Sequence, residues 1–128
     1  MPGTSVQYDH PNCTVRREEH VNNLTGIAST SMQKLLMHQA FKLKAVHSLV
    51  VTAGTNDVAG VDIYIGTTSV GAITHGTDTA GSINTSGAIN ASGTANDVIE
   101  LKGKATSATM VNSYSIEYEV LPSAVFTE

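Results

Sequence analysis

Residues 110–120, Met-Val-Asn-Ser-Tyr-Ser-Ile-Glu-Tyr-Glu-Val, carry the clearest structural signal in the chain. From position 113 onward, small polar or acidic side chains alternate with large apolar ones. This period of two is typical of a strand with one buried and one exposed face. Pro122 follows, and a residue that cannot donate to a β-ladder is expected at such an end. We predict a strand with Met110, Tyr114, Ile116, Tyr118 and Val120 toward the core and Ser113, Ser115, Glu117 and Glu119 on the opposite face.

Three further stretches show the same period. Residues 61–65 place Val61, Ile63 and Ile65 inward, with Asp62 and Tyr64 outward, and residues 98–104 place Ile99 and Leu101 inward. Residues 69–74 are a shorter, weaker strand. Short strands separated by turns, with no βαβ crossover, predict an all-β antiparallel sandwich or jelly roll. In residues 41–52 the expected apolar face consists of Phe41, Leu43, Ala45, His47, Leu49 and Val51, opposite Lys42, Lys44, Ser48 and Thr52.

Residues 81–93 contain the near repeat Gly-x-Ile-Asn-x-Ser, taken twice. A six-residue period is found in β-helices, but repeat stacks need about three units or more to be stable. The favoured interpretation is a pair of short strands or a long loop, with glycines at the bends. In that case Ile83 and Ile89 should fill the core.

The chain changes character near residue 40, which suggests residues 1–40 as an N-terminal part and 41–128 as the sandwich domain. Residues 1–26 lack a period and predict an irregular arm, either a loose terminus or, as we favour, a segment that docks on another subunit. Residues 29–40 fit either one short helix or a first strand. The arm residues expected to make the interaction are Val6, Tyr8, Val15, Arg16, Arg17, Val21 and Leu24.

Composition excludes several classes of protein. The chain has 128 residues, 41% of them apolar, and a formal net charge of −4, which fits one folded domain and disfavours a nucleic-acid partner. It has no apolar run of about 18 residues for a membrane helix and no signal-peptide pattern at its start. The single cysteine, Cys13, cannot form an internal disulfide.

Catalytic and metal motifs are missing from the sequence. Cys13, His10 and His20 do not have the spacing of a compact ligand pair, and no nucleophile elbow or phosphate-binding glycine loop occurs. Glu117 and Glu119 could form a carboxylate pair, but we favour a solvated strand face opposite Lys102 and Lys104. We therefore expect a protein that is not an enzyme and has no cofactor or metal.

Three segments of the sequence resemble those of a known family: residues 41–55, residues 61–71 (Val-Asp-Ile-Tyr-Ile-Gly-Thr-Thr-Ser-Val-Gly) and residues 114–122. Together they resemble small tailed-bacteriophage virion proteins that decorate or cement the capsid, over roughly residues 41–121. The resemblance implies a small β-sandwich or jelly roll that clamps neighbouring major capsid subunits. It implies a location on the capsid surface of the virion, after assembly in the host cytoplasm, and brings no catalytic residues.

The resemblance and the apolar arm together suggest a homo-oligomer, either a dimer or a trimer, with the major capsid protein as partner. The alternative function is a receptor- or glycan-binding knob that uses exposed loops such as residues 76–93. Against it, the chain has no Trp and few aromatic residues, and Tyr64 is the one aromatic that we expect to face outward from a strand.

Overall fold

The computed structural model describes residues 15–27, 29–104, 107 and 109–120. Within these ranges there is no helix, and so none that is long and apolar enough to cross a membrane. The strands are β1 (Val15–Thr25), β2 (Ser31–Leu36), β3 (Phe41–Thr52), β4 (Gly60–Ile65), β5 (Thr68–Thr74), β6 (Ile83–Thr85), β7 (Ala91–Gly93), β8 (Val98–Gly103) and β9 (Val111–Val120).

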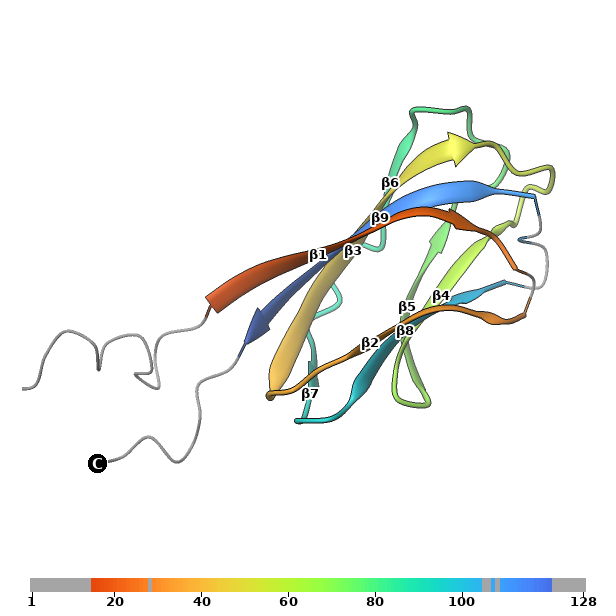
Figure 1. The fold of residues 1–128 in the computed structure, drawn as a ribbon. Coiled ribbons are helices and arrows are strands. Elements are labelled where there is room, and N and C mark those ends of the chain that lie inside the picture. The colour runs from red at the N-terminus through yellow and green to blue at the C-terminus, as the bar shows by residue number, and fades with distance from the viewer. Residues whose placement is uncertain (1–14, 28, 105–106, 108, 121–128) are drawn as a thin grey trace, which may run out of the picture.

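The strands form two antiparallel sheets that face each other as a sandwich (Figure 1). Sheet A has the order β1-β9-β3-β6, and β7 also pairs with β3; sheet B has the order β2-β8-β4-β5. If β6 and β7 are taken as one interrupted strand, this is the eight-stranded order of a jelly roll. The predicted all-β antiparallel sandwich is thereby confirmed.

The core lies between the sheets and follows the period of two that the sequence shows. Along β9 the burial alternates from Asn112 to Tyr118, so the predicted faces of this strand are confirmed. The inward faces predicted for β4 and β8 are also confirmed. The fully buried large apolar and aromatic side chains include Phe41, Leu43, Val46, Val61, Ile63, Ile73, Ile99, Leu101, Met110, Tyr114 and Ile116.

The predicted faces of β3 hold only for its first half. The pairing of β3 with β9 shifts register between Leu43 and Ala45, which marks a β-bulge. Ala45 and Val46 are consecutive and both buried, so the alternation changes phase there. One extra residue moves the side chains that follow to the other face, as far as a second register shift between Val50 and Thr52. The prediction that His47, Leu49 and Val51 face the core is therefore wrong, and Val46, Ser48 and Val50 face it instead.

The N-terminal part contributes one strand to each sheet. Residues 15–25 are β1, paired with β9 from Val15↔Val120 to Thr25↔Val111, so the prediction of an irregular arm is wrong for this range. Backbone groups that the β9 edge would otherwise leave exposed are paired by β1. Residues 31–36 are β2 and pair with β8, which excludes the short helix and confirms the alternative first strand. Residues 1–14 lie outside the described residues.

The Gly-x-Ile-Asn repeat forms the pair of short strands that we favoured over a β-helix. Both β6 and β7 pair with β3, and Gly87 makes a bend between them with a φ of 72°. Gly93 is needed for packing, because a Cβ there would overlap the ring of Phe41. Ile89 packs against the core as predicted, but Ile83 is 77% exposed, so its predicted core role is wrong.

Candidate functional site

The outer face of sheet A, which points away from the core, is the strongest candidate for a functional surface. It carries a shallow pocket of about 300 Å³. The pocket crosses β1, β9, β3 and β6, so side chains from four strands meet in it. Its lining residues are His20, Asn22, His47, Ser48, Leu49, Ile83, Ser113, Tyr114 and Ser115.

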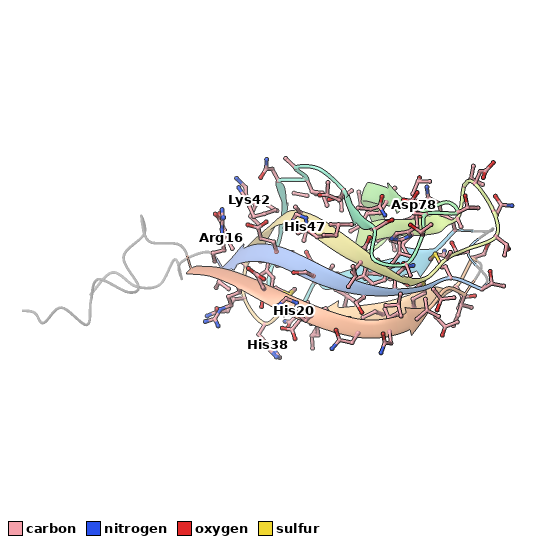
Figure 2. The ribbon with its side chains drawn as sticks, turned by 90° about the horizontal axis from the view of Figure 1, so that it is seen from above. Arg16, His20, His38, Lys42, His47 and Asp78 are labelled. Atoms are coloured by element: carbon pink, nitrogen blue, oxygen red, sulfur yellow. The ribbon has the colours of Figure 1, made fainter. Side chains whose placement is uncertain are left out.

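One side of the pocket is polar. Strand register places Ser115 between His20 on β1 and His47 on β3. His47 Nε2 lies 3.5 Å from Glu117 Oε1, and His20 Nε2 lies 3.5 Å from Glu18 Oε1. Figure 2 shows His20 and His47 at different strands of the same sheet. These imidazoles and hydroxyls offer donors and acceptors for a ligand.

The other side of the pocket is apolar. Leu49 pairs with Ile83 on β6, and both line the pocket. Val51, two residues after Leu49 on β3, is exposed beyond the pocket lining. The exposed fractions are 44% for Leu49, 40% for Val51 and 77% for Ile83. We call these three residues the apolar patch. Leu49 and Val51 were expected in the core because the bulge in β3 reverses which of its side chains face outward, and a bulge leaves no clear trace in the hydrophobic pattern. Ile83 was expected there because it is an aliphatic residue in a short strand.

Charged side chains gather at the end of sheet A where β1 begins and β9 ends. Arg16 Nη1 lies 2.9 Å from Glu117 Oε2, and Arg16 Nη2 lies 3.5 Å from Glu119 Oε2. Glu117 and Glu119 therefore lie on the outer face of β9 as predicted, but they are half-buried rather than fully exposed. Their predicted cross-strand partners, Lys102 and Lys104, are wrong, since β8 belongs to the other sheet.

The interaction residues predicted for the arm do not form one surface. Val6 and Tyr8 lie outside the described residues, and Val15 begins β1. Arg16 faces outward with its glutamates, whereas Arg17 is on the opposite face of β1, beside Tyr118. Val21 is half-buried, and Leu24 packs against the core of its own sandwich.

A second pocket, of about 370 Å³, lies where the beginning of β1 passes the segment after β2. Its walls combine charged and apolar side chains, including Arg17, Glu19, Leu36, Met37 and Tyr118. The inner side of β1 is open here because the beginning of β1 and the end of β9 extend past β2 and β8 (Figure 1).

A serine–histidine pair lies inside the sandwich. His75 Nε2 is 2.8 Å from Ser48 Oγ, and the ring of His75 meets that of Tyr114 edge-on at 5.7 Å between centroids. His75 is 2% exposed and Ser48 is 3% exposed, so a substrate cannot reach the pair. Burial lowers the pKa of His75 to about 4, and the imidazole is neutral at pH 7. The pair is a core hydrogen bond rather than a catalytic dyad.

No group of three or more His, Cys, Asp or Glu side chains that could hold a metal ion occurs in the described part of the chain. Cys13 and His10, named above with His20, lie outside it. Tyr64 faces outward as predicted, but it is half-buried and the Nζ of Lys102 lies 5.7 Å from its ring centroid. Its ring face is therefore shared with a cation rather than open.

Comparisons with known proteins concern the fold alone. No protein-family model matches the chain, and no curated protein matches it. Among solved structures it is similar to the CBM36-1 domain of a multidomain xylanase from the hindgut metagenome of Trinervitermes trinervoides. The TM-score is 0.42 and the identity 17%, over 85% of this chain and 100% of that domain. We draw nothing about ligands from a likeness this low.

Proposed function

We propose that this chain is a non-enzymatic structural protein of a virion that binds the outside of a phage capsid and clamps neighbouring major capsid subunits. The observation that carries the proposal is the apolar patch of Leu49, Val51 and Ile83 on the outer face of sheet A. Contiguous exposed apolar side chains on a small domain mark an interaction surface. Burying one such side chain against a partner contributes about 1.5–3 kcal/mol.

The resemblance supports the same proposal from the sequence side. The three segments that resemble phage decoration proteins correspond to β3, to β4 with the start of β5, and to β9. The first and last of these strands are neighbours in sheet A and support the outer face that carries the patch. The major capsid protein is the proposed partner, and the virion surface is the proposed location.

Substitution of Ile83 tests the capsid proposal. Ile83→Asp should lower the affinity for capsids that lack this protein by at least about tenfold, because a charge would replace the most exposed apolar contact. Its side chain is 77% exposed, so the fold should not suffer. The measurement is co-sedimentation of the purified full chain with capsids of the phage that encodes it.

Leu36→Asp is the matched control for this experiment. Leu36 is 53% exposed on β2 of sheet B, so the variant should bind capsids as the unaltered chain does. Failure of the unaltered chain to bind any capsid would overturn the proposal. If both variants bound capsids as well as the unaltered chain does, the apolar patch would not be the contact surface. The proposal would then lose the observation that supports it.

Glycan binding is the second candidate, and the polar side of the pocket favours it. Ligand sites combine apolar walls with a few placed polar groups, and here Leu49 and Ile83 lie beside His20, His47 and Ser115. The pocket lacks an open aromatic ring on which a sugar could stack, since Tyr114 in its lining is 2% exposed. This is why we place glycan binding second.

The two candidates are separated by one variant and two assays. His47→Ala removes a pocket imidazole but leaves the apolar patch intact, so capsid binding should change less than about threefold, as for most surface substitutions. On an array of immobilised glycans, the full chain should show no retained ligand. Glycan retention that His47→Ala abolishes, together with no capsid binding, would replace the capsid proposal with the glycan one.

A further inference from the structure

β1 is the edge strand of sheet A along one side of the molecule (Figure 2). Its 11 residues pair with β9 on one side, and no strand among the described residues pairs with the other side. The side chains of residues 16–20 are all exposed. A free edge of this length presents backbone N–H and C=O groups that another strand can pair with.

The charges along this edge have a particular order. Arg16 and Arg17 are followed by Glu18 and Glu19, so the strand reads as two cations and then two anions. Register with β9 shows which face each occupies: Arg16 and Glu18 lie beside Glu119 and Glu117 on the outer face, whereas Arg17 and Glu19 lie beside Tyr118 and Ile116 on the inner face. Each face of the edge therefore carries one cation and one anion, two residues apart.

This order is complementary to an antiparallel copy of itself. A twofold axis perpendicular to the sheet reverses the strand direction but keeps each face on its own side, so residues of the same face meet. With the axis at Glu18, Arg17 lies opposite Glu19 of the partner subunit, and the symmetric pair repeats the contact. The two Glu18 side chains meet at the axis as like charges, which lowers the stability of the pair, and each lies diagonal to Arg16 and His20 of the other copy, where the Arg16 cation offsets part of that cost. Opposite charges directly across a strand pair stabilise that pair.

We propose that β1 pairs antiparallel with β1 of a second copy of this chain, so that two sheets A join into one continuous sheet across a twofold axis. This choice selects the dimer from the dimer and trimer that the sequence left open. An isologous contact is the commonest arrangement for soluble homo-oligomers. Arg17 and Glu19 also line the pocket beside the beginning of β1, so both side chains are accessible to a partner.

The two edge strands of sheet B do not offer the same complementarity. β5, Thr68–Thr74, has no charged residue, and β2, Ser31–Leu36, has a single one, Lys34, so neither strand carries opposite charges that select an antiparallel copy. Charged side chains on an edge often prevent pairing. On β1 they do so against a neutral or like-charged strand but not against an antiparallel copy.

Charge reversal tests the proposal on the full chain without any capsid. Arg17→Glu places two glutamates opposite each other, and Glu19→Arg places two arginines opposite each other, so each single variant should raise the dimer dissociation constant at least about tenfold. The double variant restores the opposite pairs with their order reversed and should recover most of the affinity. The measurement is sedimentation equilibrium over a concentration series at low salt.

Asp57→Arg is the control, because it changes the net charge as Glu19→Arg does but lies in an exposed turn after β3. It should leave the dimer unchanged, and circular dichroism should show that all variants keep their β structure. A chain that stays monomeric at every concentration would show that the charges of β1 prevent strand pairing rather than direct it. That result would overturn the proposal. A dimer that both single variants leave intact, or that the double variant does not recover, would overturn it as well.

Discussion

Replacement of Ile116 by Ala is expected to lower the free energy of unfolding by about 2–5 kcal/mol, the usual range for truncation of a buried aliphatic side chain. Ile116 is 1% exposed at the centre of β9, between Glu19 on β1 and Val46 on β3 in the strand register. It faces sheet B, so its removal leaves a cavity between two sheets that the flanking strands hold in place.

The matched control is the next residue, on the opposite face of the same strand. Glu117→Ala removes a half-buried carboxylate that contacts Arg16 and His47 on the outer face. It should cost about 1 kcal/mol or less, because the side chains of Arg16 and His47 are exposed and ion pairs at a surface contribute little. Urea unfolding followed by circular dichroism measures both midpoints. If Glu117→Ala proved the more damaging, the faces of β9 would be exchanged and the register wrong by one residue.

Much of the sandwich could be predicted from the sequence because most strands keep a strict alternation. β4, and β9 from Asn112 to Tyr118, keep one face toward the core, and a constant face leaves a constant period in the sequence. β3 departs from this pattern because its bulge adds one residue, and the residues after Ala45 include apolar side chains in both phases. The register of a bulged strand is set by its neighbours, which a local pattern does not contain.

The first strand was missed for a related physical reason. β1 is an edge strand whose beginning extends past sheet B, so even its inward positions, such as Arg17 and Glu19, are exposed. A strand with no buried face at that end has no hydrophobic period to detect. Removal of residues 1–26 would consequently delete a strand of sheet A rather than a separate arm.

The candidate site could be predicted even less well. The pocket combines residues from β1, β9, β3 and β6, and two of its apolar contacts, Leu49 and Ile83, were expected in the core. The exposure of Leu49 depends on the bulge in β3, and that of Ile83 depends on the position at which β6 pairs with β3. Arg16 and Arg17 were expected to take part in an interaction, but Glu18 and Glu19 were not, and the arrangement of these four charges on two faces followed only from the register with β9.

Buried polar groups were also not foreseen. His75 comes directly after β5, and its ring contacts Ser48 and Tyr114 of the other sheet. Tyr114 is buried as well, and that burial raises the pKa of its hydroxyl well above its ordinary value. Nothing in the local sequence around His75 distinguishes it from the exposed histidines, because its burial results from contacts between the sheets.

Acidification from pH 7 to pH 4 is expected to remove about 3 kcal/mol of stability through His75 alone. Burial in the core lowers the pKa of this imidazole from 6.5 to about 4, with nearby Asp78 raising it slightly and Lys104 lowering it. The unfolded chain therefore takes up the proton at a higher pH than the folded chain does. The contribution of the neutral imidazole to stability is complete above pH 6.5 and is lost as the pH falls toward 4.

His75→Gln is the variant that isolates this effect, because an amide can still hydrogen-bond Ser48 but does not titrate in this range. Its stability at pH 7 sets a new baseline, and the quantity to compare is the change between pH 7 and pH 4, measured by urea unfolding at each pH. All other titratable groups are common to the two proteins, so their contributions cancel in the comparison. The unaltered chain should lose about 3 kcal/mol more than the variant over this interval. Parallel pH profiles for the two proteins would mean that His75 accepts its proton without cost, and that it is not enclosed between the sheets.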